Sequence, residues 1–390
     1  MSTGRSSTAS GNRTLAQAKR AKQDEFYTQL ADIENELKHY RDHFRGKVVL
    51  CNCDDPFESN FFKYFAANFN ALGLKKLVCT SYDGSPIAGQ GVLFAEYHEG
   101  NGKRQKPKAV VVTLEQVKDE TGDGAATLHD VELFLKRNKA VRRALKADDQ
   151  YPGGDFRSKE CVEILKTADI VVTNPPFSLF REYVAQLVEH GKQFLIIGNV
   201  NAITYKEVFK LVKENKIWMG PSIHSGDREF RVPDYYPLEA AGFRVDANGV
   251  KYIRVKGVRW FTNMDHAKRH EFIPLFKRYS PEAYPKYDNY DAINVNRVAD
   301  IPVDYDGAMG VPVTFLDKYN PEQFRILGIT DRDNNSGLKS RTYTEADVPN
   351  PGDLNRRGVV SVDGELKSTY ARLLIKRKKM GVPAIQEPPI

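Results

Sequence analysis

The chain has 390 residues, of which 41% are hydrophobic and 28% charged, and its formal net charge is +7. We expect a soluble globular protein of this composition, and its length allows two domains. No apolar run is long enough to span a membrane, and four scattered cysteines do not form a disulfide framework. A reducing cytoplasm is the expected compartment, and the basic excess permits a nucleic-acid partner without requiring one.

Residues 1–14 are rich in Ser, Thr and Gly, which predicts disorder, and they lack the apolar segment of a secretory signal. A helix is expected over about 15–43, with a break or kink near 24–28. Its later part has helical spacing of apolar residues, namely Leu30, Ile33, Leu37 and Tyr40. Phe26 lies at the break, and a core position is the simplest interpretation of its spacing.

A β-α-β unit is predicted next. The β-branched run 47–53 indicates a strand, Ser59 is a helix cap, and 74–80 indicates a second strand. Such units bring strands together in parallel, and an acid after the second strand commonly binds a ribose. The acids at these strand ends are Asp54, Asp55 and Asp83. Each could equally be an ordinary turn or cap residue.

Residues 85–150 interrupt the alternation of strands and helices. Runs 91–99 and 109–117 predict a hairpin, and a basic helix is expected after them. The basic residues are Lys136, Arg137, Lys139, Arg142, Arg143 and Lys146. Such a run is usually a solvated helix face, although it could also meet phosphates.

The most informative stretch is the apolar strand 170–173 followed by Asn174-Pro175-Pro176-Phe177. Proline lacks an N–H and restricts the residue before it, so the strand ends here in a rigid turn. Ligands of open α/β sheets bind at this edge. The Asn174 amide and a proline carbonyl can accept from an exocyclic amine, while the ring of Phe177 stacks on a flat heterocycle. A plain Pro-Pro turn with Asn174 as a helix cap is the alternative.

Further elements alternate along the chain to about residue 261, which predicts a doubly wound α/β sheet. They are helices at 160–167, 178–190 and 205–215, strands at 193–198 and 217–219, and a strand-rich stretch at 251–261. Beyond about Asp265, Tyr, Asn, Asp and Pro become frequent, and short strands and turns are expected. This region ends in a basic segment, which contains Lys367, Arg372, Lys376, Arg377, Lys378 and Lys379. Two interpretations of the segment stay open: a frayed, solubilising tail and a contact with DNA.

The acids after the first two strands, the Asp155-Phe156 loop and the Asn174 turn should all lie at the carboxyl edge of one sheet. Carboxylates beside a base-reading turn suit a nucleoside-like cofactor next to an amine-bearing ring. The combination is more specific than any one of its motifs.

Six stretches carry a resemblance to a known family. They are DEFYTQLADIENEL from Asp24, KVVLCNCDDPFESNFFKYFAANFNALGLKKL from Lys47, GDFRSKECVEILKTADIVVTNPPFSLFREYV from Gly154, FLIIGNVNAI from Phe194, WFTNMDHAKR from Trp260 and YPKYDNYDAINV from Tyr284. Together they resemble the EcoRI-type adenine-specific DNA methyltransferases over most of the chain. The resemblance implies a Rossmann-like S-adenosylmethionine-dependent fold that methylates the N6 amine of an adenine flipped from DNA.

The resemblance also implies roles for single residues. The implied cofactor contacts are Phe26 and Thr28 over the methionine part, Asp54 and Asp55 in the first cofactor motif, Asp83 at the ribose, and Asp155 with Phe156 at the adenine. The implied catalytic motif is Asn174, Pro175, Pro176 and Phe177. One departure from methyltransferases at large is that Cys-Asp-Asp-Pro replaces the glycine-rich first loop, which leaves the contacts around 54–59 open.

The expected organisation is a cofactor-binding catalytic domain at 15–265, with the insertion at 85–150, and a target-recognition region at 266–390. Double-stranded DNA is the expected partner, a cognate restriction endonuclease is a further one, and the protein is expected to be monomeric and to need no metal. Two alternatives stay open: the same chemistry on RNA or on a protein glutamine, and a non-catalytic DNA-binding protein on this scaffold.

Overall fold

The computed structural model describes residues 28–53, 59–82, 109–124, 127–137, 142–224, 227–232, 242–331 and 334–378. The chain forms two compact units. The N-terminal unit comprises Met1–Ala202 and Met219–Asp265, and the C-terminal unit comprises Ile203–Trp218 and His266–Ile390. The segment that includes the helix expected at 205–215 therefore belongs to the C-terminal unit.

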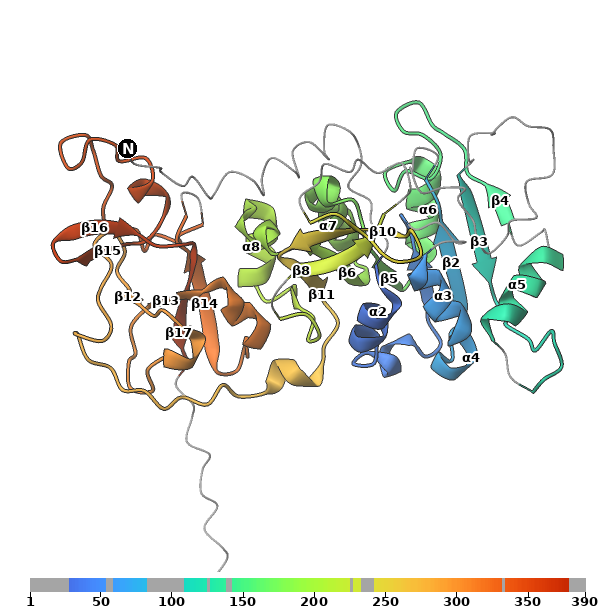
Figure 1. Cartoon of the computed structure of the whole chain (residues 1–390), viewed down its shortest axis with the longest axis horizontal. Helices are drawn as coiled ribbons and strands as arrows, with labels where there is room; N and C mark the ends of the chain where they lie inside the picture. The colour runs from blue at the N-terminus through green and yellow to red at the C-terminus, as the bar shows by residue number, and fades with distance from the viewer. Residues whose placement is uncertain are drawn as a thin grey trace, which may run out of the picture. The chain divides into compact units, whose positions relative to one another are not determined.

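An eight-stranded sheet, in the order β4-β3-β2-β1-β5-β6-β11-β7, organises the N-terminal unit (Figure 1). Its parallel strands are β1 (Val48–Cys51), β2 (Lys76–Thr80), β5 (Ile170–Thr173) and β6 (Gln193–Asn199). The strands that run antiparallel to a neighbour are β3 (Val110–Leu114), β4 (Arg142–Ala144) and β11 (Val258–Thr262), and β7 (Trp218–Met219) lies at the edge. The α/β class and the predicted strands at 47–53, 74–80, 170–173 and 193–198 are confirmed, with small shifts of their ends.

Helices cover both faces of the parallel strands, which explains why β1 and β5 are buried at every position. The helices on one face are α2 (Leu30–Leu37), α3 (Asn60–Ala67), α4 (Phe69–Leu72) and α5 (Leu128–Arg137), and those on the other are α6 (Lys159–Thr167) and α7 (Phe180–Glu189) (Figure 1). Phe180 of α7 packs against Phe261 of β11, with ring centroids 4.9 Å apart. Ser59 caps α3 as predicted, because its Oγ accepts from the N–H groups of Phe61 and Phe62.

Two expectations need correction in this unit. The long helix over 15–43 is wrong for its described part: α2 ends at Leu37, and a 3-10 helix (Arg41–Phe44) follows. The basic helix is wrong beyond Arg137, because Arg142–Ala144 forms the edge strand β4 against β3. Residues 1–27 and the first arm of the expected hairpin, 91–99, lie outside the described residues.

The strand-rich stretch at 251–261 contains two strands, and they belong to different sheets. Gly257 has a φ of +71°, a conformation that favours glycine, and separates β10 (Lys251–Lys256) from β11. Strand β10 belongs to a three-stranded sheet of order β8-β10-β9, with β8 at Asp227–Arg231 and β9 at Arg244–Val245. Local alternation shows two strands but does not show that the chain changes sheets between them.

A four-stranded sheet of order β12-β13-β17-β14 organises the C-terminal unit. Its elements are α8 (Lys206–Lys213), β12 (Ile293–Asn294), β13 (Met309–Pro312), β14 (Phe324–Ile329), β17 (Arg372–Arg377) and a hairpin of β15 (Val359–Val362) with β16 (Glu365–Ser368). Short 3-10 helices lie at Ala267–His270, Val298–Asp300, Val313–Lys318 and Leu354–Arg356, and another (Val200–Thr204) follows β6.

The basic end of the chain is not a frayed tail over its described part. Strand β17 pairs with both β13 and β14, and its Leu373, Leu374 and Ile375 are fully buried. Deletion of 366–390 would remove this central strand, so the effect of such a deletion on DNA binding cannot be separated from the loss of the fold. Point substitutions are therefore the informative test of a DNA contact.

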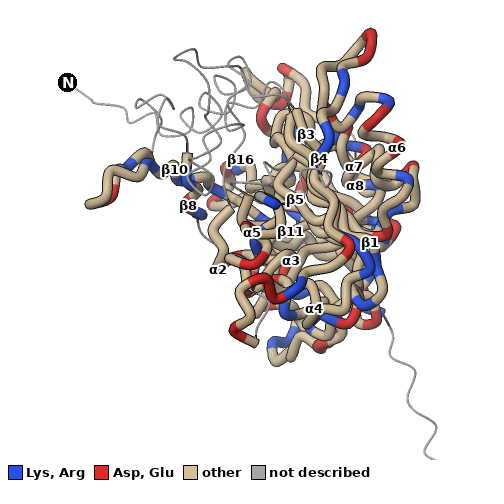
Figure 2. Tube along the Cα trace, turned by 90° about the vertical axis from the view of Figure 1, so that its right-hand side faces the viewer, with Lys and Arg blue, Asp and Glu red and all other residues tan. Residues whose placement is uncertain are grey.

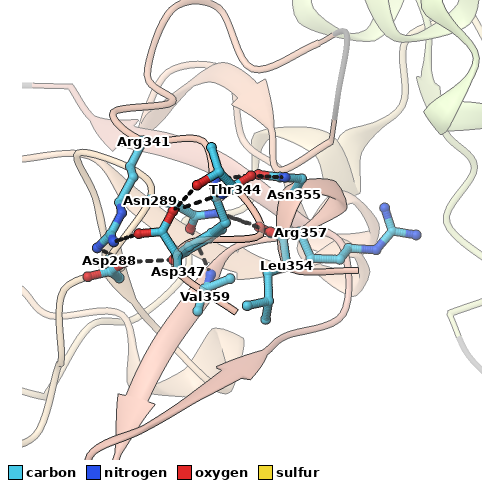
Figure 3. A network of polar contacts seen from close by, with 10 residues as sticks. Asp288, Asn289, Arg341, Thr344, Asp347, Leu354, Asn355, Arg357 and Val359 are labelled. Carbon is cyan, nitrogen blue, oxygen red and sulfur yellow. Dashed lines mark hydrogen bonds and ion pairs between the residues drawn. The ribbon is translucent and has the colours of Figure 1, made fainter. Parts of the chain in front are cut away.

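Polar side chains hold the long connection between β14 and β15 (Figure 3). Asp288 accepts hydrogen bonds from Arg341 (3.0 Å) and from the hydroxyl of Tyr343 (2.6 Å). Asn289 donates to the carbonyl of Arg357 (2.8 Å) and accepts from the N–H of Val359 (2.8 Å). The buried polar residues of the 284–295 stretch include four that lie inside the fold of this unit: Tyr287, Asn289, Tyr290 and Asn294.

In Figure 2, the Lys and Arg positions and the Asp and Glu positions are both scattered along the described trace. Arg137 pairs with Glu120 at 2.7 Å, and Arg143 pairs with Glu160, so cations of the predicted basic helix are partly neutralised where they stand. Over the described part of the chain, no helix has the length and apolarity needed to cross a bilayer.

Candidate active site

The strand order reverses at β1, which lies between β2 and β5 although β2 follows it in the chain. Ligands of open α/β sheets bind at such a switch point, beyond the carboxyl ends of the strands. Strands β1 and β5 pair at Val49 with Ile170 and at Leu50 with Val171. The segments that emerge here are 52–53 after β1, 81–82 after β2 and 174–177 after β5.

The Asn-Pro-Pro-Phe turn follows β5 directly at this edge, as predicted. A short 3-10 helix begins at Phe177 with Pro176 as its N-cap residue, and no side chain caps it. The following helix, α7, has Leu179 as its N-cap residue, also without a side-chain hydrogen bond. Asn174 is therefore the N-cap residue of neither helix. The turn is enclosed, since Asn174 is 6% and Phe177 is 7% exposed.

Asn52 links the ends of β1 and β5 to α7. The hydroxyl of Thr173 donates to the Asn52 carbonyl oxygen, and the hydroxyl of Tyr183 donates to Asn52 Oδ1. All three residues are buried, and buried polar groups depend on such partners. Sequence reasoning missed both Asn52 and Tyr183. The available signals were an amide at the end of an apolar strand and a hydroxyl on the apolar face of α7.

The loop of Gly154, Asp155 and Phe156 packs onto the carboxyl end of β2. Gly154 has a φ of +78°, and a Cβ there would lie 1.9 Å from the carbonyl oxygen of Ser81, so only glycine allows this approach. The ring of Phe156 packs edge-on against Tyr183, with centroids 5.0 Å apart. The fold thus brings two predicted adenine contacts to the same edge as the Asn174 turn.

Arg157 fixes the carboxylate of Asp155. Its Nε donates to Asp155 Oδ1 (3.0 Å), and its second guanidinium nitrogen donates to Oδ2 (2.8 Å). Hydrogen bonds with Asp155 raise the pKa of Arg157 above its ordinary value, so the guanidinium stays charged. Arg157 also lies over the ring of Tyr151, 4.6 Å from its centroid. Sequence reasoning missed Arg157, and this bidentate pair holds Asp155 in one orientation.

Thr28 lies beside the start of α3, because its carbonyl accepts from Asn60 Nδ2 at 2.7 Å. Its hydroxyl is buried and has no hydrogen-bond partner in the described structure. Four predicted cofactor contacts lie outside the described residues: Phe26, Asp54, Asp55 and Asp83. Two of these, Asp54 and Asp83, follow described chain directly, at the ends of segments 52–53 and 81–82.

The groups at this edge are an amide, proline carbonyls, aromatic rings and a fixed carboxylate. Among the described residues, no group of three or more His, Cys, Asp or Glu side chains is placed to hold a metal ion. Cys51, Cys79 and Cys161 are buried and form no disulfide, and burial raises the pKa of Cys161 to about 11. The arrangement can bind a flat ring that carries an amine, but it offers little acid–base chemistry.

A doubly wound sheet with an Asn-Pro-Pro-Phe turn at its switch point defines an α/β methyltransferase that acts on an amine. The family model described as "Adenine-specific methyltransferase EcoRI" matches residues 14–378. The chain therefore belongs to the EcoRI family of adenine-specific methyltransferases.

Curated relatives are similar over nearly their whole length. The chain is 45% identical to the Type II methyltransferase M.EcoRI of Escherichia coli, over 95% of this chain and 98% of that protein. It is 35% identical to the Type II methyltransferase M.MgeORF184P of Mycoplasma genitalium, over 93% of this chain and 98% of that protein. It is 36% identical to the Type II methyltransferase M.MpnI of Mycoplasma pneumoniae, over 93% of this chain and 97% of that protein.

Proposed function

We propose that this protein methylates the N6 amine of adenine in DNA, with S-adenosylmethionine as the methyl donor, in restriction-modification or anti-restriction. The observation that carries the proposal is the enclosed Asn174–Phe177 turn at the carboxyl end of β5, beside the switch point of the sheet. Membership of the EcoRI methylase family supports adenine as the acceptor, and the Type II relatives support DNA as the substrate.

The turn provides the contacts for the acceptor. Asn174 Oδ1 and the carbonyl of Pro175 accept hydrogen bonds from the amine, and Pro176 keeps the carbonyl in place through its fixed φ. These contacts favour a tetrahedral nitrogen whose lone pair points away from the two oxygens. The ring of Phe177 stacks on the base, so that positioning and electrostatics supply most of the rate.

S-adenosylmethionine, when bound, supplies an activated methyl group on a sulfonium. Asn174 Oδ1 and the carbonyl of Pro175 would hold the two protons of the amine while its nitrogen takes up this methyl group, and one of these protons would then leave to solvent. The residues proposed to hold the cofactor are Phe26, Thr28, Asp54, Asp55, Asp83, Asp155 and Phe156. The buried Thr28 hydroxyl without a partner in the described structure fits this assignment, because a bound ligand would satisfy it.

Access to the turn requires movement. Asn174 and Phe177 are 6% and 7% exposed, and Phe177 packs in the hydrophobic core of the N-terminal unit. An adenine must also leave its duplex before its amine can be methylated. We therefore propose that the residues covering the turn move aside when the flipped base enters.

DNA recognition is assigned to the C-terminal unit, with 266–390 as the target-recognition region and 15–265 as the catalytic domain, including the insertion at 85–150. The C-terminal unit has a separate sheet and many irregular connections, and loops on a rigid scaffold are the usual carriers of recognition. We further propose a monomeric cytoplasmic enzyme that acts beside a cognate restriction endonuclease.

The test is methyl transfer by the purified protein from labelled S-adenosylmethionine to DNA, RNA and protein in parallel. The expected product is N6-methyladenine in double-stranded DNA, identified by mass spectrometry of the nucleosides. Sequencing of modified bases in DNA from expressing cells then gives the recognition site. Transfer to RNA or to a protein glutamine alone would contradict the proposal, as would tight cofactor binding without transfer.

A further inference from the structure

Two phenylalanines stand out on the surface of the C-terminal unit. Phe276 is 81% exposed and Phe272 is 51% exposed. They belong to a connection without helix, residues 271–279, which we call the aromatic strap. Pro274 between them is also exposed, whereas Ile273 is buried. Alternate residues of the strap thus present an apolar outer edge of Phe, Pro and Phe, which is the reverse of the usual arrangement for a surface segment.

The backbone on both sides of Phe276 is fixed. Gln323, itself buried, accepts from the N–H of Ile273 (2.8 Å) and donates to its carbonyl (2.7 Å). The N–H of Val303 donates to the carbonyl of Lys277 at 2.8 Å. The strap is therefore held three residues before its most exposed ring and directly after it, so Phe276 is presented on a rigid support.

The end of the strap is anchored in an aromatic cluster. The N–H of Tyr279 donates to Asp304 Oδ1 at 2.8 Å, and its ring packs against Tyr305, with centroids 4.6 Å apart. Tyr279 also stacks on Tyr284 at 6.0 Å. Tyr279 is half-buried in this cluster, whereas Phe272 and Phe276 of the same strap are exposed.

Cations flank the exposed rings. Lys277 and Arg278 follow Phe276 directly, Lys268 precedes the strap, and all three are exposed. Glu271 is the acid of the strap. An apolar ring beside cations matches the chemistry of duplex DNA, whose phosphates lie outside a stack of apolar base faces. Proteins that deform DNA insert rings of this kind between base steps.

We propose that the aromatic strap is a DNA-deforming wedge, in which Phe276 enters the base stack while Lys277 and Arg278 hold the flanking phosphates. The inference rests on the proposed function, because an enzyme that extrudes an adenine must compensate for lost stacking in the duplex. Phe272 supports the wedge from the same edge of the strap.

The experiment uses duplexes that carry 2-aminopurine at the target adenine, whose fluorescence rises when the base leaves the stack. With Phe276→Ala and S-adenosylhomocysteine present, we expect the fluorescence rise to fall by about 10-fold, and kcat on the normal duplex to fall by about 10-fold to 100-fold. The dissociation constant of the cofactor should not change. Phe276→Trp should restore flipping, since a larger ring can still insert.

Tyr370→Ala is the matched control, because it also removes a ring that is exposed in this unit (Tyr370 is 85% exposed). This substitution should leave base flipping unchanged. A second arm places the target adenine opposite an abasic site, where extrusion is easy. Activity of Phe276→Ala should then return to within a few-fold of the wild-type value. An equal loss on both duplexes would overturn the wedge, as would wild-type flipping by Phe276→Ala.

A change of oligomeric state in Phe276→Ala, measured by analytical ultracentrifugation, would also overturn the inference, because it would identify a protein-docking surface. Failure of the proposed function has a different signature. In that case the wild-type protein would not methylate adenine in any duplex, whatever residue occupies position 276.

Discussion

The catalytic sheet of the N-terminal unit and the long loops of the C-terminal unit depend on different interactions. In the N-terminal unit, β1 and β5 are buried at every position and hydrophobic burial sets the sheet. In the C-terminal unit, the connection between β14 and β15 depends on side-chain hydrogen bonds from residues such as Asp288 and Asn289 (Figure 3). The strands that carry the catalytic edge can be recognised in the sequence as apolar runs. The loops of the other unit depend instead on polar partners that are distant in the sequence.

The largest expected effect is at the carboxyl end of β5. Asn174→Ala removes the proposed acceptor of the amine protons, and we expect kcat to fall by about 100-fold to 1,000-fold. The melting temperature and the dissociation constant of the cofactor should stay near wild-type values. Asn248→Ala, at an exposed turn of the same unit, is the matched control. Wild-type methylation by a folded Asn174→Ala protein would remove the basis of the mechanism.

The second prediction tests whether burial also matters in the C-terminal unit. Leu374 is fully buried in β17, and Leu374→Ala should lower the free energy of unfolding by about 2–5 kcal/mol. Lys376→Ala, an exposed position on the same strand, should change it by less than about 0.5 kcal/mol. Chemical denaturation measures both. A small change in the free energy of unfolding for Leu374→Ala would mean that the polar contacts of this unit hold its fold without the apolar packing of its sheet.

The third prediction tests a polar link within the apolar unit. Tyr183→Phe keeps the ring beside Phe156 but removes the hydrogen bond to Asn52 Oδ1. We expect kcat to fall by about 10-fold, because small displacements of the reacting groups are costly, with an unfolding cost of about 1–3 kcal/mol. Tyr64→Phe is the control, a buried tyrosine of α3. Loss of stability without loss of kcat would show that the link serves the fold alone.

The smallest effect concerns Asp347 and pH. Hydrogen bonds from the N–H of Thr344 and from Arg341 lower the pKa of Asp347. Because this pKa is lowered in the folded state, the charged Asp347 carboxylate stabilises the fold fully above the unfolded-state pKa of about 3.9. That stabilisation is lost as pH falls below this value. The protection factors of amides around 340–357, which correct for the intrinsic pH dependence of hydrogen exchange, should fall by a few-fold in that acid range.

The matched variants for this prediction are Asp347→Asn and Asp353→Asn. The first should show the faster exchange at neutral pH already, because a neutral amide cannot replace the carboxylate toward Arg341. The second changes an exposed aspartate that makes no side-chain capping bond and should behave as wild type. Equal exchange in all three proteins would indicate that Asp347 does not hold the loop.

Much of the catalytic sheet could be predicted because its signals are local. The apolar runs of β1 and β5, the Ser59 cap and the Pro175-Pro176 turn each follow from neighbouring residues. The edge strand β4 could not be predicted, because Arg142 and Arg143 have no apolar pattern and form a strand only by pairing with β3.

The sequence by itself determined the strand ends, the rigid turn and the residue types of the candidate site, since these depend on hydrophobic period and on proline chemistry. Only the tertiary structure decided that β1 lies between β2 and β5, that Tyr183 bonds Asn52 and that Arg157 fixes Asp155. It also decided that Arg372–Arg377 is a central strand and not a tail. The physical reason is that sheet order and buried polar pairs join residues far apart in the chain, which local patterns do not encode.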